Sequence, residues 1–156
     1  MLPHLGPAAQ LLIIGDGPER PKLETLAGQN AQGNFVRFLG QRSDVARLLN
    51  GLDLFALSST TEGHPISVIE AMATALPVLA TNVGGIPEMI EDGKTGFLAP
   101  VDESAFTARL ASAIELRGNW PVMGAAARSA AHVRFSSETM TDRYLDLYQT
   151  IRNARG

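Results

Sequence analysis

Short runs of apolar residues alternate with longer amphipathic stretches along most of this chain. The first run, residues 11–14, has four branched aliphatic residues in a row and ends at a turn signal of glycine and proline. Later runs are likewise closed by glycine or polar residues. This pattern predicts strands at residues 11–14, 36–39, 54–57, 77–81 and 95–99.

Helical spacing of apolar residues predicts the segments between these strands. It predicts one helix at residues 18–29, a short helix capped by Ser43, and two helices that open at Pro65 and Pro87. From Asp102 onward the whole pattern is helical, and the last apolar stripe consists of Met140, Tyr144, Leu147, Tyr148 and Ile151. Aliphatic strands separated by helices are typical of a parallel sheet that is buried on both faces. We predict an α/β fold, a Rossmann-like doubly wound parallel sheet followed by C-terminal helices.

Composition excludes several classes of protein and site. The 156 residues are 45% hydrophobic and 19% charged, which is typical of one globular domain. A formal net charge of −3 argues against a nucleic-acid partner bound through bulk charge. The chain has no cysteine and its three histidines lack metal-ligand spacing, so we expect no metal site. No apolar run approaches the ~20 residues of a membrane span and no signal peptide is recognised, so we expect a cytoplasmic protein without a transmembrane segment.

The loops that follow the strands are where a ligand is expected, because open parallel sheets bind ligands beyond the carboxyl ends of their strands. Residues 15–17 (Gly-Asp-Gly) begin like a dinucleotide-binding fingerprint, but Arg20 replaces its third glycine. They indicate only a tight loop near a ligand. Residues 93–95 (Gly-Lys-Thr) resemble the end of a P-loop, yet they precede a strand instead of following one. We interpret them as the turn that ends a helix.

The loop and helix start at residues 63–67 form the strongest candidate binding site. Pro65 fixes the start of a helix, and the N–H groups of about Ile66 and Ser67 have no partner within that helix. Free N–H groups at the positive end of a helix dipole bind phosphate. Gly63 lets the chain approach a ligand closely. These residues predict a phosphate site at the entrance to the helix.

Two glutamates flank this predicted site, one in the loop and one on the helix. Glu70 lies three and four residues after Ser67 and Ile66, which places it on the same helix face. A carboxylate there can accept hydrogen bonds from both hydroxyls of a ribose. Glu62, just before the helix, would lie over the group that the phosphate carries. For an isolated pair of glutamates a solvated surface position is the usual explanation, and the surrounding motifs are what favour the functional one.

These motifs keep their order and spacing from residue 11 to about residue 148. They comprise residues 12–19, 36–40, 53–59, 62–73, 77–81, 83–88, 93–100, 135–138 and 143–148. Together they resemble the donor-binding domain of retaining glycosyltransferases with the GT-B fold, in particular the large family 4. By this resemblance the fold is the second half of a GT-B fold.

The resemblance implies a role for each matched position. Glu62 is the first glutamate of the family's Glu-x7-Glu motif, placed at the donor sugar and implicated in catalysis. Glu70 is the second, which binds the nucleotide ribose. Arg42 lies where the family binds the nucleobase, although an ordinary surface arginine fits this position equally well. The expected donor-binding residues are Gly15, Gly17, Arg42, Gly63, His64, Pro65, Ile66, Ser67 and Glu70, with His64 expected mainly to pack within the loop.

The implied activity is transfer of a sugar from a UDP-, GDP- or ADP-sugar to an acceptor hydroxyl, with retention of configuration and without a cofactor or metal. The acceptor would be a sugar, a lipid-linked sugar or a small molecule, and relatives with lipid-linked acceptors are commonly peripheral to the membrane. Two alternatives stay open. The chain could be a non-catalytic nucleotide-sugar-binding fragment, or a nucleotide-sugar epimerase of the same fold.

The resemblance covers only part of a GT-B enzyme. We interpret residues 1–156 as a single donor-binding domain that lacks the N-terminal acceptor domain and its own first strand. The isolated chain is then expected to be inactive without an N-terminal domain, or to act in a homo-oligomer. Residues 1–10 are expected to be the end of the helix after the absent strand. In the strand order 3-2-1-4-5-6, the strands at residues 11–14 and 54–57 would pair directly or leave a gap that another chain fills.

Overall fold

The computed structural model describes residues 9–29 and 35–154 of the chain. The chain divides into two compact units, the first up to Arg47 and the second from Leu48 onward. Each unit contains its own parallel sheet. The interpretation of residues 1–156 as one donor-binding domain stays a prediction.

A parallel pair of strands forms the sheet of the first unit. Strand β1 (Leu11–Ile14) pairs with β2 (Val36–Gly40), and helix α1 (Arg20–Gln29) lies between them in sequence. Both strands were predicted from the apolar runs and are confirmed. The helix begins two residues later than predicted, because a hydrogen bond from the N–H of Arg20 to the carbonyl oxygen of Gly17 (3.1 Å) closes a turn before it.

The start of helix α2 (Val45–Leu49) also differs from the prediction. Asp44 stands directly before the helix, so Ser43 lies one position too early to cap it. The carbonyl oxygen of Asp44 accepts a hydrogen bond from the N–H of Arg47 (3.0 Å) and so begins the helical pattern. Within α2, Leu49 is buried, as the apolar spacing predicted.

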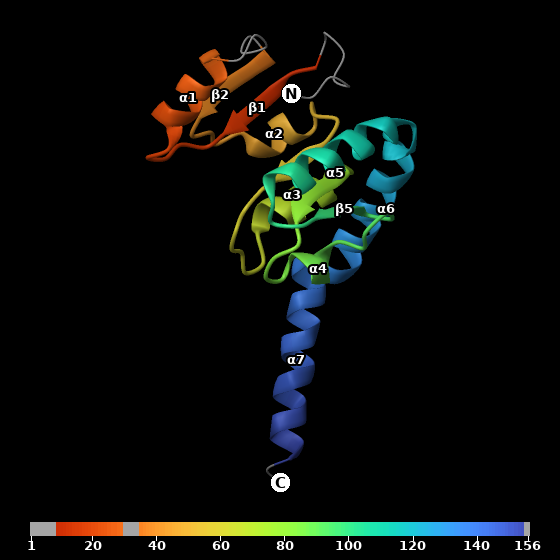
Figure 1. Cartoon of the computed structure of the whole chain (residues 1–156). Helices are drawn as coiled ribbons and strands as arrows, with labels where there is room; N and C mark the ends of the chain where they lie inside the picture. Colours follow the sequence, from red (N-terminus) through yellow and green to blue (C-terminus); the bar gives the residue numbers. More distant parts are fainter. Residues whose placement is uncertain (1–8, 30–34, 155–156) are drawn as a thin grey trace. The chain divides into compact units, whose positions relative to one another are not determined.

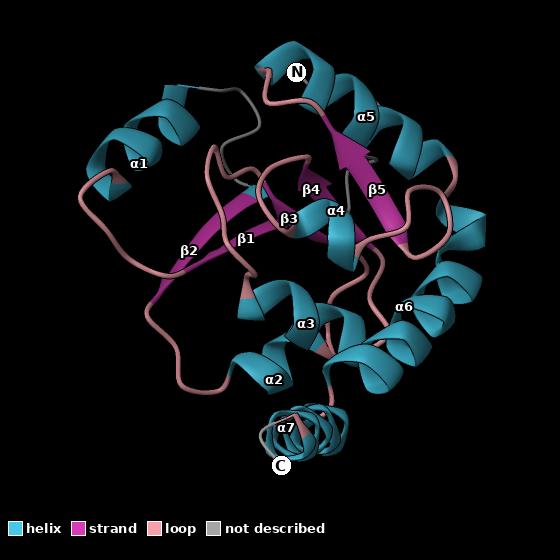
Figure 2. Cartoon of the chain, turned by 90° about the horizontal axis from the view of Figure 1, so that it is seen from below, coloured by secondary structure: helices cyan, strands magenta, loops and turns pink. Residues whose placement is uncertain are grey.

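The second unit contains three parallel strands in the order β3-β4-β5 (Figure 2). Its first elements are β3 (Phe55–Leu57), α3 (Ile66–Ala73), β4 (Val78–Thr81), α4 (Ile86–Met89) and β5 (Gly96–Ala99). Val78 lies opposite Phe55 on one side and Gly96 on the other. All four residues of the central strand β4 are buried, whereas the edge strand β3 is only partly buried. The predicted burial on both faces is therefore realised at the centre of this sheet.

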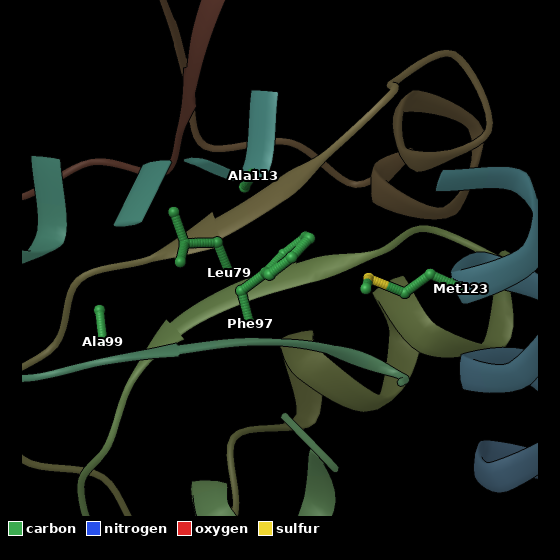
Figure 3. Close-up of a cluster of buried hydrophobic side chains, with 5 residues drawn as sticks. All are labelled: Leu79, Phe97, Ala99, Ala113 and Met123. Atoms are coloured by element: carbon green, nitrogen blue, oxygen red, sulfur yellow. The ribbon is translucent and has the colours of Figure 1, made fainter. Parts of the chain in front are cut away.

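The core of the second unit lies against helix α5 (Glu103–Glu115), with α6 (Trp120–Phe135) contributing at one end. The buried cluster drawn in Figure 3 consists of Leu79, Phe97, Ala99, Ala113 and Met123. Trp120 packs against it, and its indole N–H donates to the carbonyl oxygen of Ala113 (2.9 Å). Figure 2 shows α5 on one side of the strands and α3 on the other. The sheet is thus covered by helices on both faces, as a doubly wound fold requires.

Helices occupy the chain from Glu103 onward, as predicted. A 3₁₀ helix (Arg117–Asn119) joins α5 to α6, and α7 (Ser137–Asn153) follows α6. The side chain of Asp102 caps α5 by accepting a hydrogen bond from the N–H of Ala105 (2.8 Å). Helix α7 has no buried residue, and Figure 1 shows it extending from the end of α6. Its predicted apolar stripe is exposed at each of Met140, Tyr144, Leu147, Tyr148 and Ile151.

The turn between α3 and β4 contains a strained residue. Ala75 has φ +62°, in the left-handed region that favours glycine. The N–H of Ala75 donates to the carbonyl oxygen of Met72 (3.0 Å), and the N–H of Leu76 donates to that of Ala71 (3.1 Å). This pair of bonds is the Schellman motif, which ends α3 and turns the chain into β4.

The two sheets, β1-β2 and β3-β4-β5, share no paired strands. Of the two predicted alternatives, direct pairing of β1 with β3 is not observed among the described strands. The expectation for residues 1–10 falls largely on residues 1–8, which lie outside the described residues.

Candidate functional site

Two loops of the second unit meet at the carboxyl ends of β3 and β4. The loop before α3 contains Glu62 and Gly63, and the loop before α4 contains Gly84 and Gly85. The N–H of Gly85 donates to the carbonyl oxygen of Gly63 (2.9 Å). Gly84 has φ +53°, and a Cβ atom there would lie 1.7 Å from the carbonyl oxygen of Glu62. The loops therefore pack backbone against backbone, which only glycine permits at this position.

The carboxylate of Glu62 is held by a neighbour within its own loop. The hydroxyl of Ser59 donates to Glu62 Oε1 (2.7 Å), and both residues are half-buried. The carbonyl oxygen of Ser59 in turn accepts a hydrogen bond from the hydroxyl of Thr81 (2.5 Å), the last residue of β4, which is 3% exposed. The side chain of Glu62 thus occupies a fixed place beside the start of α3 instead of extending freely into solvent.

The N-terminus of α3 is open. Pro65 is its N-cap, buried with φ −67°, and provides no side-chain cap. The first helical N–H groups, of Ile66 and Ser67, have no carbonyl partner within the helix, because intrahelical bonding starts with the N–H of Val68 to the carbonyl oxygen of Pro65 (3.1 Å). Ile66 is 71% exposed although it is a large apolar residue. This geometry can accept an anion at the helix entrance.

Glu70 lies one turn further along α3. Its side chain is exposed, while Val68, Ala71 and Met72 of the same helix are buried. Glu70 therefore belongs to the outer face of α3, the face that Ile66 and Ser67 share by helical spacing. An exposed carboxylate beside an open helix terminus offers acceptors for hydroxyl groups of a ligand.

His64 lies against the second loop. A Cβ atom at Gly85 would lie 2.4 Å from its Nδ1 atom, so the ring rests directly on the second loop. Its Nε2 atom is 3.8 Å from an oxygen of Glu88, and the side chain is half-exposed. Gly63 beside it has no atom within 4 Å of a Cβ position, so the space next to the backbone there is open. A donor contact of His64 stays a prediction.

The other predicted site residues, Gly15, Gly17 and Arg42, belong to the first unit. Gly15, the residue after β1, has φ +124°. Its N–H donates to the carbonyl oxygen of Gly40, the last residue of β2 (2.9 Å). The guanidinium of Arg42 binds the carboxylate of Asp44 through two hydrogen bonds (2.8 and 2.9 Å). This pairing raises the pKa of Arg42 and lowers that of Asp44. Contacts of these three residues with a donor stay predictions.

Ser59 and Thr81 were not predicted as part of this site. The signal for Ser59 was weak, because a serine three residues before a glutamate in a polar loop is common. The bond from Thr81 joins residues 22 positions apart and depends on the sheet, so the sequence alone does not reveal it. Across residues 9–29 and 35–154, no group of three His, Asp or Glu side chains could hold a metal ion. None of the described helices is long and apolar enough to cross a membrane.

Comparisons with known proteins identify the family and the fold of this chain. The chain matches the family described as glycosyl transferases group 1 over residues 1–115. It is 37% identical over 147 residues to the N-acetyl-alpha-D-glucosaminyl L-malate synthase of Bacillus anthracis, a match that covers 92% of this chain and 38% of that protein. Crystal structures of Anabaena HepE in complex with UDP and with UDP-glucose match it with TM-scores of 0.81 and 0.82. Both share 28% identity with this chain and cover 92% of it and 42% of HepE.

This chain therefore spans about two fifths of the length of these relatives. The family match covers well over half of the chain, and it includes both strand-to-helix loops that form the candidate site. The resemblance inferred from the sequence motifs is confirmed. The chain belongs to the group 1 glycosyltransferases and has the α/β architecture of their GT-B fold.

Proposed function

We propose that this chain binds a nucleotide diphosphate sugar and forms the donor-binding part of a retaining glycosyltransferase. The observation that carries the proposal is the open N-terminus of α3, with Glu62 on its loop side and Glu70 on its outer face. The anion site and the two carboxylates match the three parts of such a donor: diphosphate, sugar and ribose. The complexes of HepE with UDP and UDP-glucose support this class of ligand.

In this proposal each group of the site has one role. The N–H groups of Ile66 and Ser67 bind the diphosphate, where the helix dipole favours negative charge. Glu70 accepts hydrogen bonds from the ribose hydroxyls, and Glu62 accepts one from a hydroxyl of the donor sugar. Gly63 leaves room for the sugar because no atom lies within 4 Å of the position that a Cβ would occupy there.

The chemistry of transfer would depend on stabilising the leaving group. Negative charge develops on the diphosphate as the bond to the sugar breaks, and preorganised N–H donors stabilise such charge in the transition state. A diphosphate oxygen of the departing nucleotide would receive the proton of the acceptor hydroxyl. The acceptor we propose is a sugar, a lipid-linked sugar or a small molecule with a free hydroxyl. Turnover would also require the part of the enzyme that corresponds to the rest of its longer relatives.

Titration calorimetry of the 156-residue chain with UDP, GDP and ADP tests the proposal. One of these nucleotides should bind, and Glu70→Ala should weaken its binding about ten- to a hundredfold, the loss of charge-assisted hydrogen bonds worth about 1.5–3 kcal/mol. Glu70→Gln should weaken nucleotide binding less than Glu70→Ala, because glutamine keeps one acceptor oxygen. Glu115→Ala, an exposed glutamate at the end of α5, serves as the control and should bind like wild type. Binding of none of the three nucleotides, or equal binding by Glu70→Ala, would contradict the proposal.

A further inference from the structure

Ser59 is the middle residue of a short chain of hydrogen bonds that connects Thr81 to Glu62. Its hydroxyl donates to Glu62 Oε1 (2.7 Å), and its carbonyl oxygen accepts from Thr81 (2.5 Å). Thr81 is buried at the end of the central strand, which makes it a rigid anchor. The chain of bonds therefore runs from the core of the sheet to the carboxylate of Glu62.

The main chain around Glu62 is fixed from the other side as well. The N–H of Gly85 donates to the carbonyl oxygen of Gly63, and Gly84 lies in contact with the backbone of Glu62. With the main chain held on both sides, the remaining freedom of Glu62 is the rotation of its side chain. Among the described residues, the hydroxyl of Ser59 is the group that restrains this rotation by a hydrogen bond.

We propose that Ser59 is a positioning residue for Glu62: its hydroxyl holds one carboxylate oxygen so that the other meets a hydroxyl of the donor sugar. An ionised carboxylate only accepts hydrogen bonds, so a donor from the protein and a donor from the sugar can occupy its two oxygens at once. Holding the carboxylate in place before binding removes the rotational entropy that the sugar would otherwise have to offset. This inference rests on the proposed binding of a nucleotide sugar.

A matched pair of variants separates the hydroxyl of Ser59 from its volume. Ser59→Thr keeps the hydroxyl, whereas Ser59→Val has the shape of threonine without it. Ser58→Val makes the same chemical change at the exposed neighbouring residue and serves as a control. Circular dichroism and thermal unfolding of all variants establish that the chain still folds. In the ligand-free chain, the carboxyl carbon resonance of Glu62, assigned with Glu62→Gln, should move in Ser59→Val and stay in place in Ser59→Thr.

The second measurement uses whichever of UDP, GDP and ADP the wild type binds, together with the glucose and N-acetylglucosamine conjugates of that nucleotide. The affinity is expressed for each conjugate as the ratio of its Kd to that of the free nucleotide. Ser59→Val should change this ratio about fivefold against Ser59→Thr for at least one conjugate, as loss of one hydrogen bond predicts, with the affinity for the free nucleotide unchanged. Ratios that are the same in both variants, or an unmoved Glu62 resonance, would overturn the inference. Failure of wild type to bind any of the three nucleotides would instead refute the proposed function. Normal nucleotide binding with unchanged ratios leaves that function standing and removes only the role of Ser59.

Discussion

The two units of this chain have strands of similar length but differ in how deeply they are buried. In the second unit the buried hydrophobic residues extend from Leu49 to Ala131, and Phe97 is only 1% exposed. Among the described residues up to Arg47, by contrast, no hydrophobic side chain is fully buried, and Leu11 and Leu26 are more than half exposed. The same apolar runs in the sequence thus produce a closed core in one unit and a partly covered sheet in the other. Regular secondary structure does not by itself imply a stabilising core.

Replacement of one phenylalanine in each unit tests this difference most directly. Phe97→Ala should lower the free energy of unfolding by about 3–5 kcal/mol, because it opens a cavity in the cluster with Leu79 and Met123. Phe38→Ala, at a half-buried position of β2, should cost about 1–2 kcal/mol, because less apolar surface is lost from its environment. Urea unfolding followed by circular dichroism measures both values. Equal losses would show that the first unit is as well packed as the second.

A substitution in the second unit should have a smaller effect of opposite sign, an increase in the free energy of unfolding. Ala75→Gly should raise the free energy of unfolding by about 1 kcal/mol, because glycine adopts φ +62° without the steric cost that alanine has there. Ala108→Gly, at an exposed position inside α5, is the control and should lower it by about 1 kcal/mol. The thermal midpoint should move by about 4 °C in each direction. A destabilising Ala75→Gly would mean that contacts of the alanine methyl group outweigh the strain.

Both units contain carboxyls with lowered pKa values, Asp16 and Asp44 in the first and Asp102 in the second. Acid should nevertheless affect the first unit first, because none of its described hydrophobic side chains is fully buried. The hydrogen bond from Arg20, with a further one from the N–H of Gly17, lowers the pKa of Asp16 below 3.8. A carboxyl with a lowered pKa stabilises the folded state above its unfolded value of 3.8, and that contribution is lost as pH falls through the folded pKa. We therefore expect hydrogen-exchange protection of β1 and β2 to fall as the pH is lowered below 3.8, while the buried strand β4 stays protected. NMR exchange measured at several pH values checks this.

The control for the acid effect is Asp16→Asn, which removes the titrating group. In this variant the pH dependence of protection in β1 and β2 should be reduced. Asp44, whose pKa is lowered by Arg42, would account for the part that is left. A loss of protection in β4 before β1 would contradict the comparison between the two units.

The sequence predicted the elements of this fold well, because they depend on local patterns. The strand at residues 11–14 was predicted with its observed bounds, and Pro65 marked the start of α3 within one residue. The exposure of the predicted stripe on α7 could not be read from its spacing, because spacing identifies an apolar face without showing what covers it. Ala75 could not be predicted either, since alanine carries no signal for a left-handed conformation.

The sequence singled out two glutamates for the candidate site but not the residues that hold Glu62 in place. Glu62 and Glu70 stood out by their spacing and motifs. Ser59 holds the carboxylate of Glu62 and is itself bound by Thr81 of β4, while Gly84 of another loop contacts the backbone of Glu62. Such contacts depend on how the sheet brings distant segments together, which a single sequence does not specify. The separation of β1 and β3 into different sheets likewise depends on the pairing of strands and not on their composition.

The close contact between Gly84 and the carbonyl group of Glu62 has a consequence for protein engineering. Because there is no room for even one methyl group between them, the loop before α3 and the loop before α4 fit together as one unit. Chimeras that exchange donor loops between members of the family should therefore carry residues 59–65 and 82–86 across together. An exchange that puts a residue with a side chain at position 84 would introduce a clash with the backbone of Glu62 that no side-chain repacking can relieve.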